Sequence, residues 1–268
     1  MATLDIRIEA ALGTYDDDCR WELIRGVLTE CPDDVLDAGL GLLSSDLDRR
    51  RTLGADILGR LVGVEPNCEA AVAAALMAAS AVEKSPAPLA SVVAALGHVG
   101  DAGTLGRIFP LVDNPNPEVR LAVAFAVSTI SPQPLAPEAR RALIRLCRDS
   151  EPEVRDWATF GLGRLTDADG PDVRDALLAC AQDGSREARA EALFGLAVRR
   201  DPRAVPHLIR ALQSPAVGGL EVDAAAAAAD PRLLPALWAL RLAGIADQFR
   251  LRRAIDRCSG TGRQPQPS

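Results

Sequence analysis

The stretch that decides the fold is PEVRDWATFGLG at residues 152–163. The arginine of this stretch is Arg155. Related stretches place Arg120 in PEVR 35 residues earlier and Arg189 in REAR 34 residues later. A period of this length, with helix-forming residues inside each copy, is typical of stacked helix pairs in which each pair contacts only its neighbours. The sequence therefore predicts a repeat architecture built from α-helices.

The same register extends over six units when the chain is aligned on the Leu-Gly pair at residues 162–163. At intervals of 38, 31, 35, 34 and 34 residues, the arginine position is filled by Arg51, Leu89, Arg120, Arg155, Arg189 and Asp223. Within one unit a stripe at helical spacing should face the first helix of its pair. This stripe consists of Val154, Ala158, Gly161, Leu162 and Leu165.

Asp149 followed by Val154-Arg155, and Asp183 followed by Ala188-Arg189, resemble the Asp…Val-Arg signature of the HEAT-repeat superfamily. The resemblance is to the short bacterial type named after phycobilisome-lyase HEAT-like repeats, and it covers roughly residues 32–243. It implies an all-α fold, a right-handed α-solenoid of about seven to eight helix pairs. It also implies that aspartate and arginine form a structural ladder between repeats, made here by Arg120, Asp149, Arg155, Asp183 and Arg189. We expect a weaker ladder where Ser45, Leu89, Asn114 and Asp223 replace its members.

The ends of the chain are less repetitive than its middle. We expect N-terminal capping helices at residues 1–45, HEAT-like repeats at 46–243 and a C-terminal capping helix at 244–257. Gly, Pro, Gln and Ser dominate residues 258–268, which predicts a disordered tail.

Composition narrows the choice of location and partner. The six cysteines show no metal-binding spacing, and the first residues show no signal-peptide pattern, so we expect a cytoplasmic protein. From Pro231 onward, seven arginines against two aspartates give a net charge of +5, and with a total of −7 the residues before it carry −12. An acidic body disfavours nucleic acid and anionic membranes as partners. A monomer is the favoured oligomeric state.

In the resembled family the second helices of the pairs line a concave face, which we take as the candidate binding surface. On a helical wheel, Asp156 and Thr159 lie farthest from the first helix, and Phe160 flanks them. The phenylalanines at this flanking position are either packed between neighbouring second helices or form a partly exposed aromatic strip. Trp157 is either core or an anchor for a partner. The predicted partner-binding residues are Leu121, Ala124, Phe125, Asp156, Thr159, Phe160, Leu193 and Phe194.

No group of residues predicts catalysis, a metal or a cofactor. His98 and His207 lie in different predicted helices and neither is followed by Glu, unlike the His-Glu pairs of deoxyhypusine hydroxylase, an iron enzyme built on similar repeats. The sequence therefore predicts a non-catalytic protein–protein interaction scaffold that binds a peptide or helix on its concave face. The resemblance leaves a phycobilin-lyase-like, chromophore-handling protein as the main alternative. A HEAT-like DNA glycosylase is a further alternative, which the acidic body disfavours.

Overall fold

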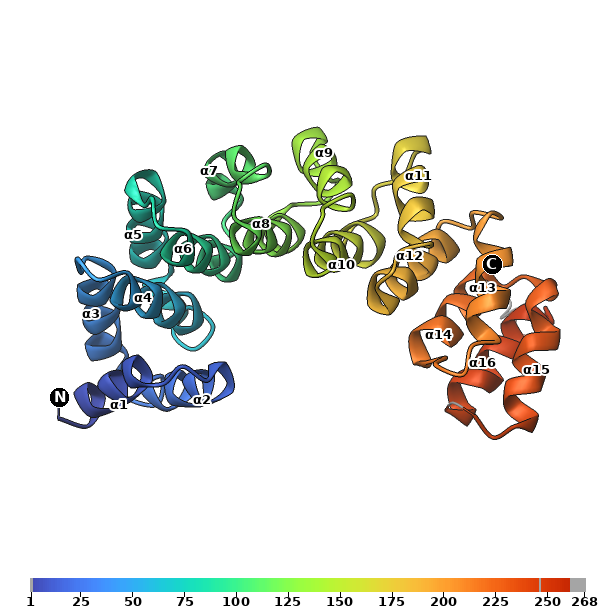
Figure 1. The fold of residues 1–268 in the computed structure, drawn as a ribbon, viewed down its shortest axis with the longest axis horizontal. Coiled ribbons are helices and arrows are strands. Elements are labelled where there is room, and N and C mark those ends of the chain that lie inside the picture. Colours follow the sequence, from blue (N-terminus) through green and yellow to red (C-terminus); the bar gives the residue numbers. More distant parts are fainter. Residues whose placement is uncertain (1, 246, 261–268) are drawn as a thin grey trace, which may run out of the picture. The chain divides into compact units, whose positions relative to one another are not determined.

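The computed structural model describes residues 2–245 and 247–260, and every regular element in this part of the chain is helical (Figure 1). The predicted all-α repeat architecture is therefore confirmed. By its internal contacts the chain divides into two compact units, residues 1–132 and residues 133–268, which we describe separately.

The N-terminal unit consists of four consecutive helix pairs. Its described helices are α1 (Ala2–Gly13), α2 (Asp17–Val27), α3 (Pro32–Leu43), α4 (Asp48–Leu61), α5 (Glu69–Val82), α6 (Pro86–Val99), α7 (Leu105–Ile108) and α8 (Pro117–Ile130). The second helices α4, α6 and α8 pack on one another in sequence order, while α3 and α5 cover α4 and α6. Each pair thus contacts mainly its neighbours, as a repeat array requires.

The C-terminal unit repeats the same plan. Its described helices are α9 (Pro137–Leu146), α10 (Pro152–Phe160), α11 (Pro171–Cys180), α12 (Arg186–Val198), α13 (Ala204–Leu212), α14 (Gly219–Ala228), α15 (Leu234–Leu242) and α16 (Gln248–Cys258). In Figure 1 the first helices α9 and α11 lie side by side on one side, and α10 and α12 on the other. With both units, sixteen α-helices are described, which corresponds to eight pairs.

Local sequence explains where these helices begin. Pro117, Pro152 and Pro171 each stand at the first helical position, where the backbone has no hydrogen-bond donor to lose. Asn116 adds a side-chain cap to α8, because its Oδ1 accepts the backbone N–H of Glu118 at 2.8 Å.

Small residues let successive second helices approach closely. A Cβ atom on Gly195 of α12 would lie 2.7 Å from the Cα of Gly163, closer than such atoms come in proteins. In the N-terminal unit a Cβ atom on Gly97 of α6 would lie 2.7 Å from the ring of Phe125 and 3.1 Å from the Cα of Ala126. These glycines are therefore packing positions between repeats.

The end of α10 departs from regular helical geometry. Residues Gly161–Leu165 form a π-helical turn, which adds a residue to the turn and rotates the side chains that follow. Leu165 is therefore 40% exposed, although the 3.6-residue period predicted that it would face the first helix. The rest of the predicted stripe, from Val154 to Leu162, is buried as expected.

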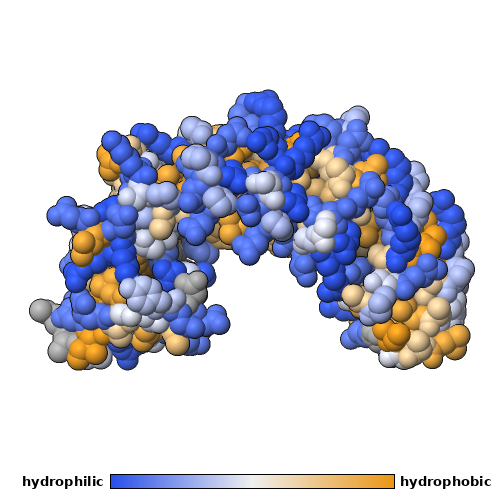
Figure 2. Space-filling view, in the orientation of Figure 1, coloured by the Kyte–Doolittle hydropathy of each residue, from blue (hydrophilic) through white to orange (hydrophobic). Residues whose placement is uncertain are grey.

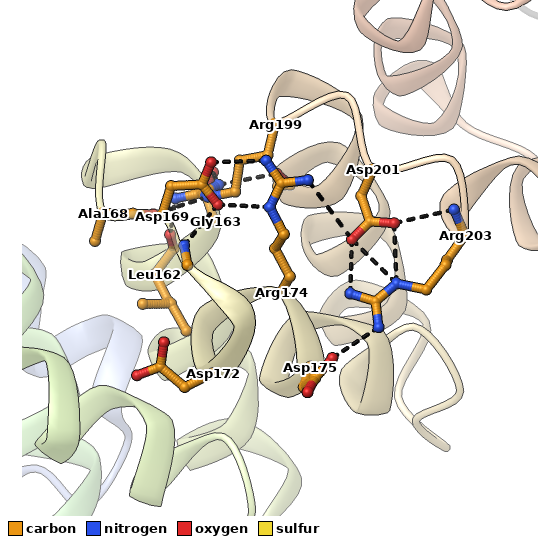
Figure 3. A network of polar contacts seen from close by, with 12 residues as sticks. Leu162, Gly163, Ala168, Asp169, Asp172, Arg174, Asp175, Arg199, Asp201 and Arg203 are labelled. Atoms are coloured by element: carbon orange, nitrogen blue, oxygen red, sulfur yellow. Dashed lines mark hydrogen bonds and ion pairs between the residues drawn. The ribbon is translucent and has the colours of Figure 1, made fainter.

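One arginine of α12's C-terminal end closes this irregular turn (Figure 3). The guanidinium of Arg199 donates to five backbone carbonyls at 2.8–3.2 Å, those of Leu162, Gly163, Thr166, Ala168 and Gly195. Burial lowers the pKa of Arg199, which fits a cation that exchanges water for these carbonyl dipoles. Arg199 therefore joins the last turn of α12 to the π-helical turn and to the loop that leads to α11.

The same end of the repeats carries a chain of ion pairs. Asp201 accepts Nη2 of Arg203 at 2.7 Å, and Nη1 of Arg203 reaches Asp175 of α11 at 2.7 Å (Figure 3). Arg174 of α11 pairs in turn with Asp169 at 2.7 Å, and this lowers the pKa of Asp169 to about 2. Asp201 is buried, whereas the pairs of Arg203 with Asp175 and of Arg174 with Asp169 are exposed. The exposed pairs contribute little on their own, so their main effect is to set the register of adjacent loops.

The predicted domain boundaries remain predictions, with one adjustment. Helix α16 runs through Cys258, whose side chain is buried, so the predicted tail does not begin at residue 258. Residues 261–268 of the predicted tail lie outside the described residues. None of the described helices is both long and apolar enough to cross a membrane.

Candidate interaction surface

The ladder pairing implied by the family resemblance is present between α10 and the loop before α12. Arg155 donates Nε and Nη2 to the two carboxylate oxygens of Asp183 at 2.5 and 2.9 Å. The hydrogen bonds from Arg155 lower the pKa of Asp183, and its Oδ1 also accepts the backbone N–H of Ser185 at 2.7 Å. Both side chains are mostly buried, so we assign them a structural role rather than a place on the binding surface.

Two further ladder pairs do not follow the sequence pattern. Arg51 of α4 pairs with Glu83, before α6, at 2.7 Å, so a glutamate takes the place of the aspartate. Asp223 of α14 is ion-paired with Arg250 of α16, which reverses the two charges. An ion pair therefore exists at Asp223 with its two charges exchanged, and it is more exposed than the pair of Arg155 with Asp183.

Arg120 lies in the N-terminal unit and Asp149 in the C-terminal unit. Arg120 donates Nη1 to the carbonyl of Asn114 at 2.9 Å. Asp149 is buried, and its Oδ1 accepts the backbone N–H of Glu151 at 3.0 Å. Arg189 donates Nη1 to the carbonyl of Asp183 at 2.6 Å.

Three of the predicted partner-binding residues are not available to a partner. Ala124, Thr159 and Leu193 are 0%, 0% and 2% exposed, so their assignment to a binding surface was wrong. Thr159 was expected far from the first helix, but its Oγ1 lies 3.7 Å from the Sγ of Cys147, directly after α9. The wheel treated a second helix as covered on one side only, whereas first helices and neighbouring second helices enclose it on several sides.

The exposed stripe of the second helices is centred on the phenylalanines. Phe125, Phe160 and Phe194 are all half-buried, as are Leu121 and Asp156. The rings therefore both pack and reach the surface, and the alternatives of packing and partial exposure are both partly realised. We call the stripe of the C-terminal unit, made by Trp157, Phe160, Arg164, Glu191 and Phe194, the α10–α12 face.

Aromatic rings and one arginine form the middle of the α10–α12 face. The Trp157 and Phe160 rings meet edge to face, with their centroids 5.7 Å apart. The guanidinium of Arg164 lies 5.6 Å from the centroid of Phe160 and 5.1 Å from that of Phe194, which joins α12 to the π-helical turn through cation–π contacts. Arg164 was not among the residues predicted for the binding surface.

Carboxylate side chains also belong to this face, and one of them contacts Arg164. Glu191 lies 3.4 Å from Nη1 of Arg164 through its Oε1, while its Oε2 is buried without a hydrogen-bond partner. Burial raises the pKa of Glu191, and burial together with nearby Glu187 and Asp183 raises the pKa of Asp156. The face therefore combines aromatic surface with negative charge that Arg164 only partly balances.

The N-terminal unit has the same motif at equivalent positions. Arg60 and His98 each follow a Leu-Gly pair, as Arg164 does. The Arg60 guanidinium lies 4.9 Å from the centroid of the Trp21 ring, and the His98 ring lies 4.9 Å from that of Phe125. The residue after Leu-Gly thus contacts an aromatic ring in three repeats, and this recurrence was not used to predict the surface.

The His98 ring lies at the surface and is tilted by 59° against the Phe125 ring, and its surroundings predict an acid-sensitive side chain. Packing around the ring, and then the charge of Arg60, lower the pKa of His98 to about 4. An unfolded chain takes up this proton near pH 6.5, so the free energy of unfolding should fall as the pH drops from about 6.5 to about 4. An NMR titration of His98 should give a midpoint well below 6.5, and Arg60→Gln should raise it. A midpoint at or above 6.5 would contradict the placement of His98 beside Phe125 and Arg60.

The described residues provide no candidate metal site. No three His, Cys, Asp or Glu side chains within the described ranges are grouped so as to hold an ion. His207 contacts Nη2 of Arg210 through Nδ1 at 3.0 Å and lies far along the chain from His98.

Figure 2 shows hydrophilic residues over much of the visible surface of both units, with hydrophobic residues in smaller areas between them.

Comparison with known families and structures agrees with this geometry. A family model of HEAT repeats matches residues 73–163 and 111–188, and the PBS lyase HEAT-like repeat model matches residues 188–214. The chain is a HEAT-repeat protein. Its recognition from the spacing of Asp149, Arg155, Asp183 and Arg189 is therefore confirmed. A search of the curated proteins gives no match.

Among solved structures, this HEAT-repeat protein is similar to YibA of Escherichia coli, with 26% identity, a TM-score of 0.74, and coverage of 95% of this chain and 92% of YibA. An engineered protein matches at 16% identity and a TM-score of 0.59 over 96% of this chain and 77% of its own. The complex of CpcE and CpcF of phycocyanin lyase from Nostoc matches at 16% identity and a TM-score of 0.52 over 85% of this chain and 88% of that chain. The last two similarities concern the fold.

Proposed function

We propose that this HEAT-repeat protein is a non-catalytic scaffold that binds a segment of another protein on the exposed stripe of its second helices. The α10–α12 face is the proposed centre of the contact, and it replaces the surface centred on Thr159. The observation that carries the proposal is the row of half-exposed rings at Trp157, Phe160 and Phe194. Aromatic side chains with arginine between them are the residues that most often dominate protein–protein binding energies.

The charges of the face indicate which segment fits it. Glu153, Asp156, Glu187 and Glu191 lie along the exposed stripes of α10 and α12, against Arg164. Binding of a basic side chain next to Asp156 or Glu191 would favour their charged forms, which burial now disfavours. A peptide or helix with both apolar and basic side chains is therefore the proposed partner. The same negative charge disfavours a nucleic-acid backbone.

The location and oligomeric state that we propose are those expected from the sequence, a monomer in the cytoplasm. All six cysteines lie in the described part of the chain and are free thiols, which supports a reducing compartment. The CpcE–CpcF complex supports protein binding as a use of this fold, because two related chains associate there.

A test of this proposal compares variants on opposite faces of one repeat. Phe194→Asp places a charge among the rings, while Ala179→Asp places the same charge on the exposed outer side of α11. Affinity capture from the native host, with quantitative mass spectrometry, should show the bound proteins reduced about tenfold by Phe194→Asp and unchanged by Ala179→Asp. Phe194→Leu keeps the apolar packing and should retain most of the binding.

The outcome must be separated from unfolding. The helical circular dichroism signal and melting temperature of Phe194→Asp should stay close to those of Ala179→Asp, since Phe194 is only half-buried. Equal capture by the two aspartate variants would refute the α10–α12 face as the binding surface. A visible absorbance of the purified protein would instead favour the chromophore-handling alternative.

A further inference from the structure

The ladder arginines share one fixed orientation. In four second helices the Nη1 atom donates to the backbone carbonyl six residues earlier. The distances are 2.9 Å for Arg51, Arg120 and Arg155 and 2.6 Å for Arg189. In Arg51 and Arg155 this bond leaves the opposite edge of the guanidinium, Nε with Nη2, pointing toward the loop of the next repeat. Such an edge matches the two oxygens of a carboxylate.

Two of these edges hold a carboxylate from the same chain. Arg155 grips Asp183 with 2.5 and 2.9 Å bonds, and Arg51 grips Glu83 with 2.7 and 3.2 Å bonds. Both carboxylates are only 8% exposed. Each also accepts a backbone N–H from its own loop. In these two repeats the guanidinium edge is therefore a carboxylate-binding site that a side chain of the protein itself occupies.

Arg189 has the same orientation, but the loop of the next repeat offers it no carboxylate. The loop that follows α13, residues 213–218, reads QSPAVG and contains no acidic residue. Ser214 takes the place of the aspartate in the turn, because its Oγ accepts the N–H of Ala216 at 3.2 Å as Asp183 accepts that of Ser185. Within the described residues, Nε and Nη2 of Arg189 have no hydrogen bond or ion pair.

A cavity of about 410 Å³ stands where that carboxylate would be. Arg186, Arg189, Arg210, His207, Ser214 and Glu221 line it, together with apolar residues of α12 and α13. Glu221 is compensated, since Arg186 lies 3.3 Å from its Oε1 and the N–H of Gly218 donates to its Oε2 at 3.0 Å. Burial and then the charge of Arg210 lower the pKa of His207. Arg189, whose charge also acts on Asp183 and Glu187, and Arg210 therefore leave the cavity with two guanidinium groups that form no ion pair within the described residues.

We propose that this cavity is a binding site for a carboxylate ligand, with the Nε–Nη2 edge of Arg189 holding the carboxylate as Arg155 holds Asp183. The cavity is larger than one aspartate side chain and has the size of small-molecule sites. Arg210 supplies a second positive charge, so a ligand with two carboxylates suits the site best. The site uses loops and the start of α12, and it does not depend on the aromatic rings of the α10–α12 face.

The test uses an on-chain competitor. Ser214→Asp supplies the missing carboxylate from the loop itself, and Ser214→Asn is its uncharged match in size. Titration of the full chain with succinate at low salt, followed by calorimetry, should show saturable binding to the wild type and to Ser214→Asn. Ser214→Asp should bind at least about tenfold more weakly. Its melting temperature should rise, because the empty position of the ladder is then filled.

Further arms identify the source of the carboxylate and the outcomes that contradict the site. A capped peptide with a single aspartate tests for a side chain of a protein. Binding of the peptide points to such a partner and binding of succinate alone points to a free small acid, and either supports the site. Three results overturn it: no saturable binding of either, the same affinity in Ser214→Asp, or tighter binding of inorganic phosphate than of succinate. Phe194→Asp should leave succinate binding unchanged, so the two proposals fail separately.

Discussion

Replacing Arg199 with alanine is expected to destabilise the C-terminal unit by about 3 kcal/mol. The change removes a guanidinium that donates to five backbone carbonyls and leaves these carbonyls without their donor. Water reaches some of them after the change, so the loss is smaller than five separate hydrogen bonds would suggest. In urea unfolding followed by tryptophan fluorescence, to which Trp157 directly before the π-helical turn contributes, the midpoint should fall clearly.

The neighbouring arginine provides the control for this prediction. Arg200 is exposed, so Arg200→Ala removes the same charge without removing a carbonyl partner. Its φ of 51° is the same strain for arginine and for alanine. It should change the free energy of unfolding by less than about 0.5 kcal/mol. Arg199→Lys keeps the charge but has a single nitrogen, and we expect it to recover only part of the loss. Equal effects of Arg199→Ala and Arg200→Ala would show that charge, rather than the carbonyl network, stabilises this end of the repeats.

Gly54→Ala is expected to destabilise the N-terminal unit by about 2 kcal/mol or more. A Cβ atom at this position in α4 would lie 2.6 Å from the backbone N of Leu43 and 2.8 Å from the carbonyl O of Gly39 in α3. Backbone atoms cannot rotate away, so α3 and α4 must separate and lose packing along their contact. This loss exceeds the gain of about 1 kcal/mol in helix propensity from glycine to alanine.

The same substitution in α3 should have the opposite sign. Gly41 is exposed, and a Cβ atom there meets no atom within 4 Å. Gly41→Ala should therefore stabilise the unit by about 0.5–1 kcal/mol. Thermal melts with hydrogen exchange of the α4 amides would measure both variants. Two changes of the same sign would mean that close approach of α3 and α4 does not control the stability of this unit.

Much of the fold follows from the sequence because the same residue pattern occurs in several repeats. The period from Arg120 to Arg189 predicts helix pairs, and the pair Arg155–Asp183 lies where the family signature implies. The signature of Asp and Arg did not predict the pairs Arg51–Glu83 and Asp223–Arg250, because these pairs have complementary charges on other residue types or at exchanged positions. A search for complementary charges about one repeat apart, rather than for Asp and Arg alone, would have found them.

The binding surface was harder to predict, since it depends on how each second helix is enclosed. A wheel with one buried side places Thr159 at the centre of the free face, but in the structure Thr159 is buried and Phe160 is at the surface. The π-helical turn then displaces Leu165, which no 3.6-residue period anticipates. The open edge of Arg189 was invisible for a different reason, because it is defined by the absence of an acid in the loop after α13.

The central claim is that the α10–α12 face, and no outer helix face, contacts the partner. Site-specific photocrosslinking in the native host tests it most directly, with benzoylphenylalanine at position 194 or at position 179. The account predicts crosslinked partner bands from position 194, reduced when Asp156 is changed to Lys, and none from position 179. Crosslinks from position 179 with none from position 194 would contradict it.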